Sequence, residues 1–342
     1  MGGDIQGGIQ VGERLLGPGR PALLVAEIGG NHGGDPALAA ALVRAAAAAG
    51  AGGVKFQAYR ASALLSRGSP YFQELAVEEL SFEDLAELTR LGRNLGLVTG
   101  LSVFDQAGLD LARTAGADFI KIASGELNHH RLLARAAAAG QPVFVSTGAG
   151  EETEVEAALA VLPPDRTVLL QCAALYPAPP ASANLAVMAG WLARGLFAGY
   201  SDHGLGLAAA RLALALGALV LEKHFTLVRT LPGGDNFLSA TPEEFRRLAD
   251  WAEEVPVLTG DRVKMVQPGE KAVRPLIRRA LLAARALPAG TRLVPEDLAL
   301  KRPPAAGPDL WGPEGLDLAV GRRLKHSLAE DEPLTRADLS DG

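Results

Sequence analysis

Two short motifs in the sequence combine a histidine with acidic and basic or hydroxyl residues: Ser201-Asp202-His203 and Glu222-Lys223-His224. Each follows or ends a short apolar run, and a stretch of helical composition, residues 205–217, separates them. Two neighbouring parallel strands would therefore carry both imidazoles to the same end of a sheet. Neutral imidazole is a common ligand of divalent metal ions, so the pattern predicts a metal site at His203 and His224. If nothing else in the chain agreed, two unrelated polar residues at strand ends would be the preferred interpretation.

The elements that must position these motifs alternate regularly along the chain. Apolar runs rich in β-branched residues predict strands at 23–28, 53–58, 97–103, 118–123, 142–146, 168–172, 196–200 and 219–224. Helical periodicity lies between them at 36–49, 82–94, 107–115, 131–139, 153–162, 184–193 and 205–216. Eight βα units of this kind predict an α/β fold, a closed (β/α)₈ TIM barrel. An open doubly wound sheet is the alternative, but the turn Gly29-Gly30-Asn31-His32-Gly33-Gly34 does not match a dinucleotide-binding glycine motif.

Polar residues collect at the predicted carboxyl ends of these strands, where barrels of this type bind their ligands. They are Glu27, Lys55, Gln57, Ser102, Lys121, Ser124, Glu126, Ser146, Tyr176, Ser201 and Glu222, beside the two histidines. Two lysines among hydroxyl groups suit a small phosphorylated anion. The carboxylates of Glu27 and Glu126 are candidates for acid–base work or for orienting a hydroxyl, with a structural role as the alternative. Cys172, inside an apolar strand, is interpreted as a buried small side chain.

Composition narrows the class of protein. The chain has 342 residues, a net charge of −6 and a single cysteine. The acidic balance and the lack of a basic stripe argue against a nucleic-acid partner. No apolar run reaches the length of a membrane span, and the first 20 residues lack the pattern of a secretory signal. One cysteine excludes an internal disulfide framework, so a cytoplasmic location is expected.

The periodicity changes after a further helix at 242–251, and this change sets the expected domain borders. From about residue 260 proline and glycine recur every few residues, and two similar phrases, 286–298 and 328–339, indicate a small, mostly β module. We therefore expect an N-terminal extension at 1–20, the barrel at 21–260, a linker at 261–275 and the small module at 276–342.

Several motifs, in order, carry a resemblance to a known family. They are Ala26-Glu27-Ile28-Gly29-Gly30-Asn31-His32-Gly33-Gly34, Val54-Lys55-Phe56-Gln57, Lys121-Ile122-Ala123-Ser124-Gly125-Glu126, Ser146-Thr147-Gly148, Tyr176-Pro177-Ala178-Pro179, Tyr200-Ser201-Asp202-His203 and Glu222-Lys223-His224-Phe225-Thr226. Together they resemble the sialic acid synthase family, which comprises N-acetylneuraminate synthase and the bacterial legionaminate and pseudaminate synthases. From Arg278-Arg279-Ala280-Leu281 onward the chain resembles the antifreeze-like (SAF) module of these enzymes, a β-clip domain.

The resemblance implies a reaction and a set of ligands. Phosphoenolpyruvate condenses with an N-acylmannosamine-like aldose to give a nine-carbon 2-keto sugar acid and phosphate. A divalent metal, Mn²⁺ first with Mg²⁺ or Co²⁺ as alternatives, is implied at His203 and His224, where it would act as a Lewis acid. Glu222 shares a face with His224 and is expected to orient that imidazole.

The resemblance also assigns residues to each substrate. The implied phosphoenolpyruvate contacts are Lys55, Ser102, Lys121, Ser124, Ser146 and Ser201, and the implied sugar contacts are Glu27, Gln57, Tyr176, Asp235 and Arg279. Glu126 matches the carboxylate that handles the attacking water or its proton. Arg279 would come from the SAF module of a second subunit, which implies a domain-swapped homodimer.

Two other interpretations stay open. One is a related phosphoenolpyruvate-dependent synthase of shorter 3-deoxy-keto acids, whose members lack the SAF-like tail. The other is a barrel that binds sugars or phosphates without turnover, suggested by Ala174, which stands where many relatives carry a polar residue before the Tyr-Pro pair. The sequence does not identify the acyl sugar, its phosphorylation state or the metal.

Overall fold

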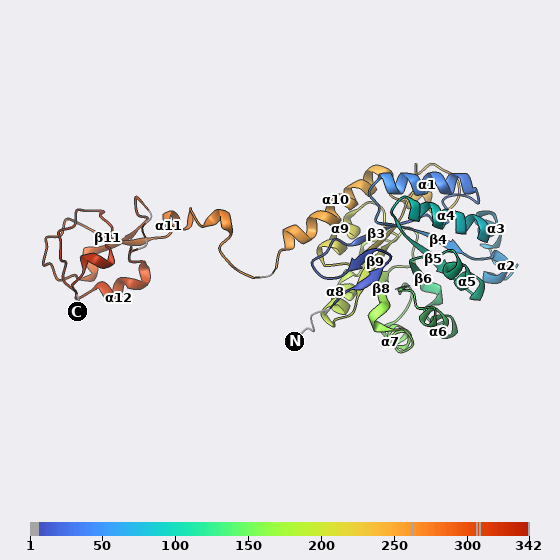
Figure 1. Cartoon of the computed structure of the whole chain (residues 1–342), viewed down its shortest axis with the longest axis horizontal. Coiled ribbons are helices and arrows are strands. Elements are labelled where there is room, and N and C mark those ends of the chain that lie inside the picture. The colour runs from blue at the N-terminus through green and yellow to red at the C-terminus, as the bar shows by residue number, and fades with distance from the viewer. Residues whose placement is uncertain (1–6, 262, 306, 308, 341–342) are drawn as a thin grey trace. The chain divides into compact units, whose positions relative to one another are not determined.

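The computed structural model describes residues 7–261, 263–305, 307 and 309–340 (Figure 1). The chain divides into two compact units, with the border between residues 261 and 262. The first unit is built around a closed barrel whose strand order is β10-β3-β4-β5-β6-β7-β8-β9. All of its strand pairs are parallel. This confirms the (β/α)₈ barrel expected from the alternation of strands and helices.

The barrel strands and their covering helices follow each other along the chain (Figure 1). The strands are β3 (Leu23–Glu27), β4 (Gly53–Ala58), β5 (Val98–Val103), β6 (Phe119–Ile122), β7 (Val143–Ser146), β8 (Thr167–Cys172), β9 (Ala198–Asp202) and β10 (Val220–His224). The helices are α1 (Pro36–Ala48), α4 (Phe82–Asn94), α5 (Gln106–Thr114), α6 (His130–Ala138), α7 (Glu152–Leu159), α8 (Leu185–Ala193), α9 (Ala208–Ala215) and α10 (Pro242–Thr259).

Side-chain caps set where several of these helices begin. Asp35 accepts from the Ala37 N–H at the start of α1, and Ser81 accepts from the Asp84 N–H at the start of α4. Thr241 and Glu244 form a reciprocal capping box at the start of α10. Such caps satisfy backbone N–H groups that have no partner within the helix. Within the described residues, no helix combines the length and the apolar character that a membrane span needs.

The interior of the barrel is apolar in its N-terminal half. Its side chains form one buried cluster of Leu23, Val25, Val98, Phe119, Phe144, Val168, Leu170 and Val220. The Phe119 and Phe144 rings stack with their centroids 4.2 Å apart. A Cβ atom on Gly100 would lie 2.1 Å from the Phe119 ring, so this strand position must lack a side chain for the ring to fit.

A short antiparallel hairpin adds to this cluster. Its strands are β1 (Ile9–Val11) and β2 (Arg14–Leu16), and the turn between them contains Gly12 at a φ of +55°. Ile9, Val11 and Leu16 are fully buried and belong to the cluster inside the barrel. Residues 9–16 are therefore part of the barrel unit, in contrast to the expected separate extension at 1–20.

One connection of the barrel is much longer than the others and contains two helices of its own. Between β4 and α4 the chain forms α2 (Ala61–Leu64) and α3 (Phe72–Glu78). We call residues 59–80 the β4–α4 excursion. The Tyr59 hydroxyl donates to the Leu75 carbonyl at 3.0 Å, and Glu79 accepts from Arg60 and from the Ala61 N–H. These bonds hold the excursion together at its base.

The second unit is small and rich in turns. It contains α11 (Arg274–Ile277), β11 (Ala280–Ala283), β12 (Leu298–Lys301) and α12 (Leu316–Ala319), and β11 pairs antiparallel with β12. Its own core includes Leu281, Leu287, Trp311, Leu324 and Leu334.

Short 3₁₀ turns occur in both units. They are Ser124–Glu126, Pro164–Arg166, Pro180–Ser182, Asn236–Leu238, Pro268–Glu270, Pro295–Asp297, Pro313–Gly315 and Arg336–Asp338.

Candidate functional site

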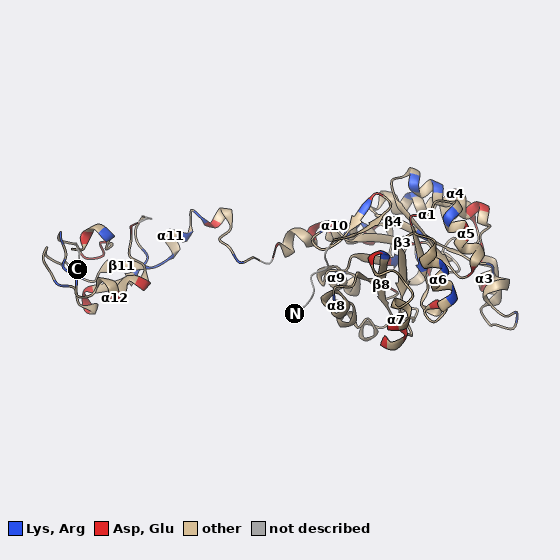
Figure 2. Ribbon diagram, turned by 60° about the horizontal axis from the view of Figure 1, so that its bottom comes forward, with Lys and Arg blue, Asp and Glu red and all other residues tan. Residues whose placement is uncertain are grey.

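The C-terminal half of the barrel interior is polar, in contrast to the apolar half below it. Side chains separated by two residues along a strand point to the same side, so the pleat that buries Val25 and Val220 also turns Glu27 and Glu222 inward. Buried polar residues in or next to the strand ends are Glu27, Lys55, Ser102, Lys121, Ser146, Ser201, His203, Glu222 and His224. In Figure 2, basic and acidic segments lie close together inside the ring of strands near β3 and β8. The structure thus brings most of the predicted site residues to one end of the barrel.

Two lysines and two carboxylates form the centre of this polar half. Lys55 Nζ lies 2.5 Å from Glu27 Oε2 and 3.8 Å from Glu222 Oε1. Lys121 Nζ lies 3.7 Å from the same oxygen of Glu222. We call these four residues the charge cluster. Because it joins β3, β4, β6 and β10 across the barrel, it fixes the ends of strands that are not all neighbours.

Burial and mutual attraction shift the pKa values of the cluster in different directions. Burial lowers the pKa of Lys121 and raises that of Glu27, because each loses contact with water. Burial also disfavours the ionised forms of Glu222 and Lys55. The two ammonium groups nevertheless hold the pKa of Glu222 below its usual value, and Glu222 and Glu27 together raise that of Lys55. Glu222 is therefore the carboxylate that the cluster keeps ionised.

Serine hydroxyls surround the cluster. The Ser102 hydroxyl accepts from Lys55 Nζ at 2.7 Å, and the Ser201 hydroxyl donates to Glu222 Oε1 at 2.9 Å. Ser124 Oγ accepts from the Gly148 N–H at 3.0 Å, while buried Ser146 Oγ has no hydrogen-bond partner. Two ammonium groups beside hydroxyls can bind one multiply charged anion, such as a phosphate ester with a carboxylate.

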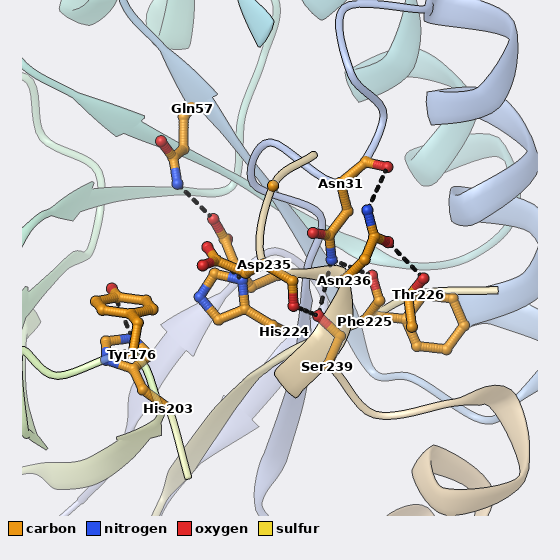
Figure 3. A network of polar contacts seen from close by, with 12 residues as sticks. Asn31, Gln57, Tyr176, His203, His224, Phe225, Thr226, Asp235, Asn236 and Ser239 are labelled. Carbon is orange, nitrogen blue, oxygen red and sulfur yellow. Dashed lines mark hydrogen bonds and ion pairs between the residues drawn. The ribbon is translucent and has the colours of Figure 1, made fainter. Parts of the chain in front are cut away.

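The two histidines lie next to this cluster, with their ring centroids 5.4 Å apart. His203 Nδ1 lies 2.9 Å from the Ala173 carbonyl oxygen and therefore carries the proton that it donates there. With the proton on Nδ1, His203 Nε2 accepts a hydrogen bond from the Tyr176 hydroxyl at 3.0 Å (Figure 3). The Tyr176 ring stacks on the His203 ring with centroids 4.1 Å apart.

His224 faces a different partner. Its Nδ1 atom is buried, has no hydrogen bond and lies 3.4 Å from Asp235 Oδ2 (Figure 3). Burial lowers the pKa of His203 to about 4 and, together with the His203 ring, holds that of His224 well below its usual value. Burial also raises the pKa of Asp235 to about 6. Both imidazoles are therefore neutral near pH 7, the state in which imidazole binds metal ions.

The nitrogen atoms of two neutral imidazoles fit a divalent ion. His203 Nε2 would exchange its hydrogen bond from Tyr176 for the ion, and buried His224 Nδ1 has no hydrogen-bond partner among the described residues. Among the described residues, however, no group of three or more His, Cys, Asp or Glu side chains is arranged to hold a metal. An ion bound by the two histidines would therefore take its other ligands from substrate or water.

The structure corrects the expected role of Glu222. The alternation of the strand places Glu222 and His224 on one face, with Lys223 on the other; Glu222 approaches Lys55 and Lys121 in the barrel interior, while Lys223 bonds to Asp202 on the outer side. One carboxylate oxygen of Glu222 accepts from Ser201, however, and the other has no hydrogen-bond partner. Glu222 thus holds the lysines of the charge cluster and does not orient the imidazole of His224.

A hydrogen-bond network behind His224 was not found by sequence reasoning (Figure 3). Asn31 Nδ2 donates to the Phe225 carbonyl and to Ser239 Oγ, both at 2.8 Å, and Ser239 Oγ donates to the Asp235 carbonyl at 2.7 Å. Thr226 Oγ1 donates to Asn236 Oδ1 at 2.6 Å. The network fixes the 233–239 segment that carries Asp235. Asn31 lies in the motif at residues 26–34, whereas no pattern in the sequence indicates a role for Ser239.

A buried ion pair on the outer side of the two strands aligns the histidine motifs. Lys223 Nζ donates to Asp202 Oδ2 at 2.7 Å and to the Gly204 carbonyl at 2.9 Å, and Asp202 Oδ1 accepts from the Gly204 N–H. Lys223 and Asp202 are opposite each other in the β9–β10 register. The pair therefore holds the backbone on both sides of His203 next to the strand that ends at His224.

The remaining predicted residues lie at the edge of the site or outside it. Gln57 donates to Glu27 Oε1 at 3.0 Å, and Glu126 Oε2 lies 2.7 Å from Nδ1 of the exposed His129. Cys172 is buried, with its sulfur 3.7 Å from His203 Nδ1. Arg279 belongs to the second unit, where it is exposed just before β11.

Fold and site together define a TIM-barrel protein whose ligand site lies at the carboxyl ends of the strands. The NeuB family model matches residues 42–264, and the SAF domain model matches residues 278–340. The chain belongs to the NeuB family and carries a C-terminal SAF domain.

Relatives and solved structures agree with this membership. The chain is 34% identical to N,N'-diacetyllegionaminic acid synthase of Legionella pneumophila, covering 93% of this chain and 94% of that protein. The N-acetylneuraminic acid synthetase structure of Leptospira borgpetersenii matches with a TM-score of 0.74 at 30% identity, covering 77% of this chain and 94% of that one. A putative spore coat polysaccharide biosynthesis protein E from Chromobacterium violaceum matches with a TM-score of 0.80 at 26% identity, covering 94% and 100%.

Proposed function

We propose that the protein is a sialic-acid-type synthase, an enzyme that condenses phosphoenolpyruvate with an N-acylmannosamine-like aldose. The observation that carries the proposal is the charge cluster beside the two neutral imidazoles: Lys55 and Lys121 provide an anion site within the same barrel end as His203 and His224. Membership of the NeuB family and the similarity to legionaminic and neuraminic acid synthases support the same reaction class.

The reaction forms one carbon–carbon bond and a carbon–oxygen bond from water, and it breaks the bond between phosphoenolpyruvate C2 and its bridging oxygen. The methylene carbon of phosphoenolpyruvate attacks the aldehyde carbon of the open-chain sugar, whose oxygen becomes a hydroxyl by taking a proton. Water adds to the resulting cationic carbon and loses a proton. Phosphate then leaves with the electrons of the carbon–oxygen bond, and the new hydroxyl loses its second proton to become the ketone oxygen; the two protons of water go to the sugar oxygen and to the phosphate. The products are a nine-carbon 2-keto sugar acid and inorganic phosphate.

The barrel side chains have distinct tasks in this scheme. Lys55 and Lys121, with Ser102, Ser124, Ser146 and Ser201, bind the phosphate and carboxylate of phosphoenolpyruvate. Glu27, Gln57, Tyr176 and Asp235 contact the sugar. Burial raises the pKa of Glu27, which suits a carboxyl group that exchanges a proton with the substrate, and Glu126 at the edge of the site handles the water or its proton.

A divalent ion, Mn²⁺ first with Mg²⁺ or Co²⁺ as alternatives, would be held by His203 and His224. When bound it supplies Lewis acidity toward the aldehyde oxygen. The proposed reaction takes place in the cytoplasm, which agrees with the single cysteine of the sequence.

The proposed function is tested by release of inorganic phosphate from phosphoenolpyruvate and Mn²⁺ with a panel of aldoses. The panel holds N-acetylmannosamine, its 6-phosphate, 2,4-diacetamido-2,4,6-trideoxy hexoses, arabinose 5-phosphate and erythrose 4-phosphate. We expect phosphate release with an amino sugar, dependent on all three components. Reactions without aldose or with chelator are the controls.

The other outcomes separate the alternatives. Release only with a simple aldose phosphate would assign the protein to the synthases of shorter keto acids. Calorimetric binding of phosphoenolpyruvate without any release would favour a binding barrel, and Ala174 would be the first residue to replace by a polar one.

We further propose that the enzyme works as a homodimer in which the SAF domain of one subunit provides Arg279 to the sugar site of the other. Leu175, Leu205 and Phe237 on the loops around the barrel end are each at least half exposed in the single chain, which suits a covering partner. The expected result is a dimer by light scattering.

Subunit mixing tests the role of Arg279. Arg279→Ala should raise the KM for the aldose without changing the dimer. At an aldose concentration well below the raised KM, mixing Arg279→Ala with inactive His203→Ala subunits should restore part of the activity, because one of the two sites then receives both intact residues. A fully active monomer would rule out this assignment.

A further inference from the structure

The end of α3 lies against two other segments at the C-terminal end of the barrel, and glycines make the contact possible. A Cβ atom on Gly30 would lie 2.0 Å from Glu78 Oε2, and one on Gly34 would lie 2.2 Å from the Val77 carbonyl oxygen. A Cβ atom on Gly234 would lie 2.7 Å from the carbonyl carbon of Gly30. The chain after β3, the chain after β10 and the β4–α4 excursion are therefore in direct contact at this point.

A single side chain of the excursion connects it to the segment that carries Asp235. Glu78 Oε1 accepts the Gly234 N–H at 2.8 Å, a bond between residues 156 positions apart in the sequence. The next residue, Asp235, directs its carboxylate toward His224 Nδ1. The other end of the segment is fixed by the Ser239 bond to the Asp235 carbonyl. Glu78 thus supplies the support on the side of the segment that faces the excursion.

We propose that Glu78 is a positioning residue of the sugar pocket: by accepting the Gly234 N–H it holds the 233–236 segment so that Asp235 faces His224. This inference rests on the proposed function, because it assigns the aldose to the side of the site that Asp235 forms. It assigns Glu78 no contact with the reacting atoms. Glu78 lies outside every motif that carries the family resemblance.

The charges around Glu78 give the bond a pH dependence. Burial raises the pKa of Glu78 from 4.5 to about 7, against the Gly234 N–H, which lowers it, and with Glu74 and Asp235, which raise it further. Tyr59, also near the excursion base, carries no charge in this range because burial raises its pKa. A raised pKa means that Glu78 binds the proton more tightly in the arrangement with the Gly234 bond than in one where this contact is broken. The arrangement is therefore most stable below pH 4.5 and weakens as the pH rises through about 7.

Hydrogen exchange at the Gly234 amide in the full-length protein tests the bond without any substrate. We expect the protection factor to fall about tenfold in Glu78→Ala, because the amide loses its acceptor. Glu78→Gln should retain protection, since its amide oxygen can still accept, and should not vary between pH 6 and 8. Glu74→Ala is the matched control: it removes an exposed carboxylate of the same helix, α3, and leaves the Glu78 bond to Gly234 and the bonds at the excursion base in place.

Kinetics test the consequence for the sugar. Glu78→Ala should raise the KM for the active aldose about tenfold with the KM for phosphoenolpyruvate within about twofold, and Glu78→Gln should restore the aldose KM. Unchanged Gly234 protection in Glu78→Ala, or an equal loss in Glu74→Ala, would overturn the positioning role. Loss of protection without a change in aldose KM would overturn its connection to the sugar. If the wild-type protein releases no phosphate with any aldose, the proposed function fails, while exchange at Gly234 still decides whether Glu78 holds the segment.

Discussion

Glu222→Ala is expected to lower the free energy of unfolding by about 3–5 kcal/mol. The Glu222 side chain is only 5% exposed, and both Lys55 Nζ and Lys121 Nζ lie within 3.8 Å of its Oε1 atom. Removing the carboxylate leaves the buried ammonium group of Lys121 without the charge that compensates it and leaves Lys55 with Glu27 alone. Urea denaturation followed by far-ultraviolet circular dichroism measures the change.

An added anion should partly restore the stability of the Glu222→Ala variant. Because the lysines lose their partner, inorganic phosphate should raise the melting temperature of Glu222→Ala more than that of the wild-type protein. Glu243→Ala is the matched control, since its ion pair with Arg247 involves a side chain that is 77% exposed, and it should cost less than about 1 kcal/mol. A cost equally small for Glu222→Ala would show that the charge cluster does not stabilise the barrel end.

The barrel itself could be predicted because a buried parallel sheet leaves a strong pattern in the sequence. Its strands are continuous apolar runs, and each predicted run overlaps a strand of the structure, as in 53–58 for β4. The β1–β2 hairpin was not predicted. Its strands have three residues each, and Ile9, Val11 and Leu16 are too few to show a period. Their burial depends on the barrel interior that they cover, which is a contact distant in the sequence.

The inward-facing part of the site could also be predicted from strand alternation. The pleat of a strand places residues i and i+2 on one face, as for Lys55 and Gln57 in β4 and for Glu222 and His224 in β10. Parallel pairing brings the carboxyl ends of the strands to the same edge of the sheet. Alternation does not say which partner a side chain selects within that space. This is why Glu222 was expected beside His224 and is found with Lys55, Lys121 and Ser201.

Contacts made by the loops could not be predicted. Asn31 reaches Ser239 and Glu78 reaches Gly234 across large separations in the sequence. The course of these connections depends on tertiary packing and on glycines that permit close approach, and neither produces a periodic pattern. The hydrogen bonds that hold the 233–239 segment therefore become visible only in the folded structure.

His203→Ala and His224→Ala are each expected to lower the rate of phosphate release by about 10³-fold, which corresponds to a loss of about 4 kcal/mol of transition-state stabilisation. Each variant removes one of the two neutral imidazole nitrogens that fit a divalent ion. Calorimetric titration with Mn²⁺ should show the same loss as weakened binding, independent of turnover. Because His203 and His224 contact different partners, Tyr176 and Asp235, an effect common to both variants points to the ligand that they share.

His130→Ala is the control for this pair, because His130 is the exposed first residue of α6 in the same barrel unit. It should leave both phosphate release and Mn²⁺ binding unchanged. Protonation gives an independent check: burial places the pKa of His203 at about 4, so metal binding should persist down to about pH 5 and be lost as the pH falls through 4. Variants that retain Mn²⁺ binding and near-normal turnover would exclude the two histidines as metal ligands. The charge cluster would then be the remaining basis for the proposed anion site, since Lys55 and Lys121 can attract an anion without a metal.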